Sequence, residues 1–233
     1  MNGLLVLFLL IFVAALPVFL VYLWFRLARF PLPLPWFLFC LLSGAAAPFI
    51  ALLLQNIFPN TLLVNALAEE LGRLLMLLIF FKILNLMGKG IPPGTAVRAG
   101  TDIAGTPGAI PGVFSSNTAV WGAIAGLLAG LGFALIESAT YGAANMGVTL
   151  LRAFTAAPLH GACGARVGAA AAVCRDHPFP ALMRFLSAAA IHGMYNFMLL
   201  FHGIPTILAI FIAFSALGSS VLFIHGTLKA AKE

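Results

Sequence analysis

The sequence predicts an all-α protein, a polytopic membrane helix bundle of about seven transmembrane helices. Its 233 residues are 63% hydrophobic and only 8% charged, which lies far outside the range of soluble domains. The apolar residues form long runs, each able to cross a bilayer, separated by short stretches rich in proline, glycine and charge. We therefore expect a single integral-membrane domain over residues 1–233 that sits in a lipid bilayer.

The first two helices are apolar runs without polar residues of catalytic type. Residues 3–25 follow no basic segment and are too long for a signal peptide, so a retained helix is expected. Arg26, Arg29 and a series of prolines end it. Residues 36–54 form the second helix, with Pro48 as a candidate kink.

The third helix, residues 62–81, carries two adjacent glutamates and an arginine inside an apolar run. Ionisable side chains at membrane depth are costly and usually mark a function. Glu69 and Glu70 precede Arg73 by four and three residues, so both carboxylates can reach the guanidinium on one helix face. A buried ion pair that only fixes helix packing needs one carboxylate, and here two are supplied.

A long loop, residues 89–118, follows the third helix. It is rich in glycine and proline, as in Pro92-Pro93-Gly94, and lacks helical periodicity. We expect it to be irregular and cytoplasmic. A loop of this length is either mobile or functional, for example a gate or a flap that contacts substrate.

The fourth and fifth helices, residues 119–144 and 148–173, carry matching faces of small residues. Such faces let membrane helices approach closely, so the two helices are expected to pack tightly against each other. The face of the fourth helix consists of Gly122, Gly126 and Gly130, and that of the fifth consists of Ala157, Gly161, Ala165 and Ala169, with Gly164 and Gly168 beside it.

Helices over residues 180–201 and 205–228 complete the bundle. Seven spans put the termini on opposite sides, and an outside N-terminus leaves little basic charge outside beyond Arg152, as the positive-inside rule requires. The net charge of +6 therefore reflects orientation, and no Lys/Arg cluster indicates nucleic-acid binding. We expect a multi-pass protein of a bacterial-type inner (cytoplasmic) membrane, with the N-terminus outside and the C-terminus cytoplasmic.

Four of the predicted helices place polar residues at a similar depth. At ~1.5 Å per residue, Glu69, Glu137 and His192 lie roughly 10–14 Å from the outer helix ends, and His160 roughly 18 Å. Carboxylates and imidazoles thus share one layer in the outer half of the membrane. The candidate site residues are Glu69, Glu70 and Arg73 on the third helix, Glu137 on the fourth, His160 on the fifth, and His192 and Asn196 on the sixth.

This set of side chains fits water activation and amide hydrolysis. It supplies a base, an acid and donors for an oxyanion, and it contains no serine or cysteine paired with a base. Two histidines and a carboxylate also form a catalytic zinc ligand set, here Glu137, His160 and His192, with Glu69 as general base. Without a metal, the histidines would instead donate hydrogen bonds to the oxyanion. Glu70 is the alternative base, because Arg73 can keep one carboxylate charged while the other takes the proton.

The four motifs resemble those of the PrsW family of intramembrane proteases, relatives of the CAAX prenyl proteases and bacteriocin-immunity proteins. Arg73 stands where PrsW members typically have lysine, whereas Glu137 favours PrsW because the CAAX branch usually has histidine there. The resemblance implies site-one cleavage of a membrane-anchored protein, such as an anti-sigma factor, with water activated by a motif-one glutamate. The motifs are Glu69-Glu70-x-x-Arg73, Gly132-Phe133-Ala134-x-x-Glu137, His160-x-x-x-Gly164 and His192-Gly193-x-x-Asn196.

Three other functions compete with this interpretation. A proton-coupled transporter would use the same carboxylates, but it predicts repeat symmetry, and the sequence has no convincing internal repeat. A non-catalytic membrane scaffold would retain the motifs only for assembly, although every position that chemistry needs is filled. A CAAX-type prenyl-protein protease would share the chemistry and differ in substrate.

Overall fold

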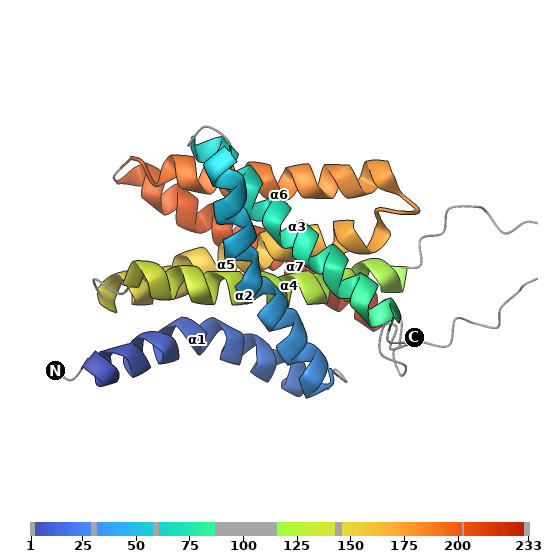
Figure 1. The fold of residues 1–233 in the computed structure, drawn as a ribbon, viewed down its shortest axis with the longest axis horizontal. Coiled ribbons are helices and arrows are strands. Elements are labelled where there is room, and N and C mark those ends of the chain that lie inside the picture. Colours follow the sequence, from blue (N-terminus) through green and yellow to red (C-terminus); the bar gives the residue numbers. More distant parts are fainter. Residues whose placement is uncertain are drawn as a thin grey trace, which may run out of the picture.

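The computed structural model is an all-helical bundle, as the composition predicts. It describes residues 3–28, 32–57, 61–86, 116–142, 146–201 and 203–230, and this part of the chain contains no strand. Figure 1 shows the N- and C-termini at opposite ends of the long axis. The helices are α1 (Gly3–Leu27), α2 (Leu34–Ile57), α3 (Leu62–Leu86), α4 (Ser116–Gly142), α5 (Met146–Val173), α6 (Pro178–Met198) and α7 (Ile204–Ala230).

The helices match the seven predicted ones, and their ends shift by a few residues. The helix α4 begins at Ser116 rather than at Ala119, because serine and asparagine favour the first positions of a helix. Most of the predicted loop, up to residue 115, lies outside the described residues. Within the described ranges, three helices are long and apolar enough to cross a membrane by length and composition alone, namely Leu34–Ile57, Thr118–Tyr141 and Ile204–Gly226.

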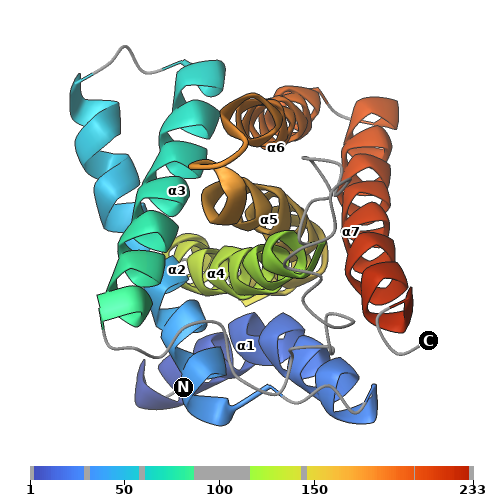
Figure 2. The ribbon, with the colours of Figure 1, turned by 90° about the vertical axis from the view of Figure 1, so that its right-hand side faces the viewer.

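The helices α4 and α5 form the centre of the bundle, with the other helices arranged around them (Figure 2). In the Thr118–Tyr141 span 89% of the most apolar window is buried, against 33% in the α2 span and 28% in the α7 span. Large apolar side chains on the outer helices are correspondingly exposed, such as Phe12 at 72% and Phe211 at 68%. An exposed apolar surface of this extent suits contact with lipid.

Close backbone contact holds α4 against α5, which confirms the predicted tight packing. A Cβ atom on Gly126 would lie 1.9 Å from the Gly164 carbonyl oxygen, and one on Gly122 would lie 2.4 Å from that of Gly168. The α5 face that meets the α4 glycines therefore includes Gly164 and Gly168. A Cβ on Gly130 would lie 2.0 Å from the His160 carbonyl oxygen, so the same contact fixes the backbone of a candidate site residue.

The helix α2 packs on another face of α4 in the same way. A Cβ on Gly44 would lie 1.8 Å from the Ala129 carbonyl oxygen, and one on Gly132 would lie 2.0 Å from that of Leu41. The helix α3 then packs on α2, where a Cβ on Gly72 would lie 3.0 Å from the Ala47 carbonyl oxygen. These contacts set the position of α3, and with it the two adjacent glutamates, relative to α4 and α5.

Candidate active site

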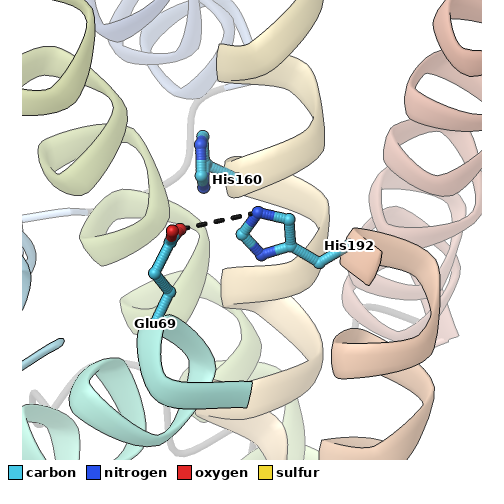
Figure 3. A group of neighbouring side chains, drawn as sticks. All are labelled: Glu69, His160 and His192. Atoms are coloured by element: carbon cyan, nitrogen blue, oxygen red, sulfur yellow. Dashed lines mark ion pairs between the residues drawn. The ribbon is translucent and has the colours of Figure 1, made fainter. Parts of the chain in front are cut away.

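Residues from four helices line one cavity of about 220 Å³. Figure 3 shows Glu69 from α3, His160 from α5 and His192 from α6 pointing toward one another. Glu137 from α4 and Asn196 from α6 line the same cavity. The structure thus brings five of the seven candidate residues to one cavity, and the other two, Glu70 and Arg73, lie behind it, fully buried at 0% exposure.

Each of the two histidines contacts Glu70 or Arg73 through its Nδ1 atom. Arg73 Nη1 donates to Glu70 Oε2, and the other Glu70 oxygen lies 2.7 Å from His192 Nδ1. Arg73 Nη2 lies 3.1 Å from His160 Nδ1. The guanidinium carbon of Arg73 also lies 4.6 Å from the centre of the Phe133 ring, which fills the remaining side. This pair therefore connects both imidazoles through one buried network.

The partners of each imidazole determine where its proton sits. Arginine has only donors, so His160 Nδ1 must accept from Arg73, and the proton of a neutral His160 is on Nε2. That Nε2–H faces Glu137 Oε2 at 2.7 Å. An ionised carboxylate only accepts, so His192 Nδ1 donates to Glu70. His192 Nε2 then faces Glu69 Oε2 at 3.5 Å across the cavity.

Arg152 near the start of α5 is a site residue that the sequence analysis assigned only to an outer loop. Its Nη2 lies 2.6 Å from Glu137 Oε2, and its guanidinium carbon lies 4.4 Å from the centre of the Tyr141 ring. Both Arg152 and Tyr141 line the cavity. The sequence spacing could have indicated both residues. Arg152 precedes His160 by about two helical turns and Tyr141 follows Glu137 by about one, so each pair shares a helix face.

Glu69 is the carboxylate with the least support from the protein. Its side chain is 13% exposed, and its one ion-pair contact among the described residues joins Oε2 to His192 Nε2 at 3.5 Å. Neither this Oε2 atom nor Glu137 Oε2 has a hydrogen bond of good geometry among these residues, so the ion-pair contacts distinguish the two carboxylates. Glu70 and Glu137 by contrast each have an arginine and a histidine partner. Glu69 is therefore the carboxylate whose oxygen remains available to a water molecule or an ion in the cavity.

The chain was also compared with known proteins. A family model described as PrsW family intramembrane metalloprotease matches residues 32–219. The chain belongs to the PrsW family. This membership indicates an intramembrane protease, which is a hydrolase and a multi-pass membrane protein. The substrates of such proteases are proteins embedded in the lipid bilayer. No curated protein and no solved structure matched the chain.

One group of described residues could hold the metal ion that the PrsW family description implies. Glu69, His160 and His192 each offer one ligand atom, and these atoms lie within 4.8 Å of one another. Glu69 Oε2 and His192 Nε2 fit a ligand role, because the first lacks a hydrogen-bond partner and the second is oriented by the Glu70 carboxylate behind it. His160 fits only if its Nε2 proton is lost, since Arg73 occupies Nδ1.

The sequence analysis had Glu137 in the metal set in place of Glu69. In the structure, the Glu137 oxygen that faces the cavity lies 2.7 Å from His160 Nε2 and 2.6 Å from Arg152 Nη2. Glu137 therefore belongs to an ion-pair network with the arginine, and the three residues whose ligand atoms lie within 4.8 Å of one another are Glu69, His160 and His192.

Proposed function

We propose that this chain hydrolyses a peptide bond of a membrane-anchored protein, with a water molecule activated by the Glu69 carboxylate. The observation that carries the proposal is the cavity itself: Glu69, Glu137, His160, His192 and Asn196 line one space of about 220 Å³ at membrane depth. Polar side chains from separate helices are costly to gather inside a bilayer unless they serve one reaction.

Glu69 is the proposed general base and Glu70 its support. The Glu69 Oε2 atom has no hydrogen-bond partner among the described residues and can accept a proton from water, whereas both Glu70 oxygens already accept from Arg73 and His192. As the water oxygen attacks the carbonyl carbon, its proton moves to Glu69. The same proton then passes to the leaving nitrogen when the C–N bond breaks, which yields an amine and a carboxylic acid, and the acid releases the second water proton to solvent.

His160 and Asn196 are the proposed donors to the oxyanion that forms on the substrate carbonyl. The Nε2–H of His160 points to the cavity side where Glu137 lies, and Asn196 lines the same cavity with an amide group. Hydrogen-bond donors that are in position before the reaction strongly stabilise the negative charge of an oxyanion in a site that excludes water. In this structure the same Nε2–H faces Glu137, so on substrate binding it would turn from Glu137 to the oxyanion, and Arg152 would remain as the partner of Glu137.

A metal-dependent form of the site is the second candidate, and the Glu69–His160–His192 group favours it. These residues would hold a zinc ion, which when bound supplies a more acidic water molecule. The Arg73 donor at His160 Nδ1 argues for the metal-free form, because it keeps the other ring nitrogen protonated.

The substrate class that we propose is a single-span regulatory protein such as an anti-sigma factor, cut in site-one fashion. The outer half of a bacterial-type inner membrane is the proposed location of the cut. Support comes from the position of the cavity near the start of α3 and α5 and the end of α6. By the positive-inside rule these helix ends are the outer ones.

The test compares membranes that contain the wild-type chain with membranes that contain the Glu69→Gln variant. New N-termini inside or next to spanning segments of membrane proteins are identified by mass spectrometry of labelled termini. We expect a small set of termini in wild-type membranes that the variant lacks, and cleavage in H₂¹⁸O should add one ¹⁸O atom to each new carboxyl terminus. Equal termini in both samples would refute Glu69 as the base.

A further inference from the structure

A second cavity, of about 170 Å³, lies between α4, α5, α6 and α7, and two arginines line it. Arg166 comes from α5 and Arg184 from α6, and neither lines the catalytic cavity. Arg166 follows His160 by six residues and Arg184 precedes His192 by eight, so the second cavity lies roughly 10 Å further along the bundle. The proposed hydrolysis makes no use of it.

Arg166 is held in place by neutral acceptors only. Its Nη1 donates to the carbonyl oxygens of Ala162 at 3.1 Å and Ala216 at 3.3 Å, and to Ser220 Oγ at 2.9 Å. Its Nη2 donates to Ser219 Oγ at 2.7 Å. These bonds fix the guanidinium beside the cavity, but none of the acceptors carries a charge. The positive charge of Arg166 is therefore positioned without being compensated.

Arg184 faces the same cavity with an unused donor. Its Nη1 atom is buried and has no hydrogen-bond partner among the described residues, and its guanidinium carbon lies 5.7 Å from the centre of the Phe223 ring. A buried donor without a partner costs free energy, which a ligand can recover. Among the described residues neither Arg166 nor Arg184 takes part in an ion pair. The described lining of the cavity thus presents two positive charges and no negative one.

The depth of this cavity in the bilayer indicates which kind of anion could bind between the two arginines. Arg166 lies seven residues before the end of α5 and Arg184 six residues after the start of α6, so each is roughly 10 Å inside its helix end. The 28 residues of α5 span about 42 Å, more than the ~30 Å of bilayer hydrocarbon, so both ends project beyond it. Arginine side chains at this level reach the phosphate layer of the lipid.

We propose that the cavity between Arg166 and Arg184 binds one phosphate group, and that an anionic phospholipid supplies it. A guanidinium matches phosphate with two parallel hydrogen bonds, and two guanidinium groups on neighbouring helices provide the charge for a lipid with net negative charge. The bound headgroup connects α5 to α6 on the side where α7 packs. The open edge of the cavity beside the half-exposed Phe223 leaves a route for the acyl chains.

The experiment measures binding of dioleoylphosphatidylglycerol to the full-length chain in a non-ionic detergent by native mass spectrometry. We expect one saturable lipid on the wild type and at least about tenfold weaker binding on Arg184→Gln. The Arg184 side chain donates no hydrogen bond to the part of the chain that the structure describes, so we expect the variant to keep its fold. Arg175→Gln is the matched control: it removes the same charge from an exposed position on the turn between α5 and α6, and its binding should equal that of the wild type.

Two further ligands distinguish the source of the phosphate. Dioleoylphosphatidylcholine, which is zwitterionic, should bind more weakly than the anionic lipid. Inorganic phosphate that binds alone, and is lost in Arg184→Gln, supports the phosphate site and moves its source from the lipid to the solution. Equal affinity of the wild type and Arg184→Gln for the anionic lipid, or no saturable binding of any of these ligands, would overturn the proposal.

Discussion

Glu69 and Glu70 are neighbours in sequence with opposite surroundings. Successive residues on a helix point about 100° apart, so only one of the two can face the cavity. Glu70 is fully buried between Arg73 and His192, whereas Glu69 reaches the cavity with an oxygen that lacks a partner. From this difference we infer that Glu69 activates the water molecule and that Glu70 positions Arg73 and His192. The two roles predict different effects of substitution.

The Glu69→Gln substitution should lower cleavage by about 10²–10⁴-fold, the usual contribution of a general base. It should leave the melting temperature close to that of the wild type, because Glu69 forms only one contact of 3.5 Å with His192. The measurements are the cleavage rate of a reporter substrate and thermal unfolding in the same detergent. A variant with full activity would transfer the role of base to another residue.

The Glu70→Gln substitution should instead destabilise the bundle. It leaves Arg73 charged and poorly paired at 0% exposure, and loss of one partner of a buried pair costs about 3–5 kcal/mol. Unfolding in a denaturant should reveal this loss, with Glu69→Gln as the neighbouring control that carries the same chemical change. Equal stability of the two variants would contradict the assignment of Glu70 as a structural support.

The imidazole of His160 predicts the outcome of metal removal. Its Nδ1 accepts from Arg73, so its Nε2 carries a proton and is not open to a metal. We expect the purified active protein to contain well under one zinc per chain, and to keep its activity after dialysis against a strong chelator. Activity that the chelator abolishes and added zinc restores would establish the metal-dependent form on Glu69, His160 and His192.

The sequence identified the residues of the cavity but not their pairing. Order and spacing placed Glu69, Glu137 and His160 in one layer, because depth along a helix follows directly from residue number. Which carboxylate faces which imidazole depends on the rotation of each helix about its axis, and that rotation is set by packing with the other helices. For the same reason Glu137 was expected in the metal set, and Arg152 was assigned to a loop.

At the scale of the elements, contact between bare backbones places α4 against α5. The sequence predicted this contact from the glycine spacing of α4, and it named the α5 face with Ala157 and Gly161, with Gly164 and Gly168 beside it. The structure uses the face that contains Gly164 and Gly168, since a side chain there would overlap the α4 backbone. Ala165 and Ala169 lie beside this line of contact, where their side chains fill space in the buried core.

The Gly126→Ala substitution should therefore separate α4 from α5. The new Cβ would lie 1.9 Å from the Gly164 carbonyl oxygen, and backbone cannot yield as a flexible side chain does. We expect a loss of stability of about 1–3 kcal/mol, together with lower activity, because the same interface supports His160. Thermal unfolding and cleavage are measured side by side.

Gly218→Ala on α7 is the matched control for this prediction. A Cβ there would meet nothing within 4 Å, so the same chemical change adds no overlap and should leave stability unchanged or slightly raised. If Gly126→Ala and Gly218→Ala melt at the same temperature, close backbone contact does not hold α4 against α5.

At the scale of the whole molecule, basic residues collect at the end of the bundle that is remote from the cavity. Arg26 ends α1, Lys82 lies near the end of α3, and Arg175 lies on the turn between α5 and α6. Figure 1 shows the ends of α1 and α3, this turn and the C-terminus on the same side of the molecule. The cavity lies toward the opposite side, where α6 ends and α5 begins.

The distribution of charge predicts the orientation of the chain in its membrane. Cytoplasmic flanks of membrane helices carry the excess of lysine and arginine, so the C-terminus should be cytoplasmic and the N-terminus outside. A fluorescent protein fused after Glu233 should fluoresce, while alkaline phosphatase at the same position should be inactive, and phosphatase fused before Met1 behind a cleavable export signal should be active.

The cavity would then open toward the outer side, so a charged thiol reagent that does not cross the membrane should modify a cysteine introduced at the exposed Tyr141. Modification only after the membrane is permeabilised, together with an active phosphatase at the C-terminus, would reverse the orientation and place the proposed cleavage on the cytoplasmic side.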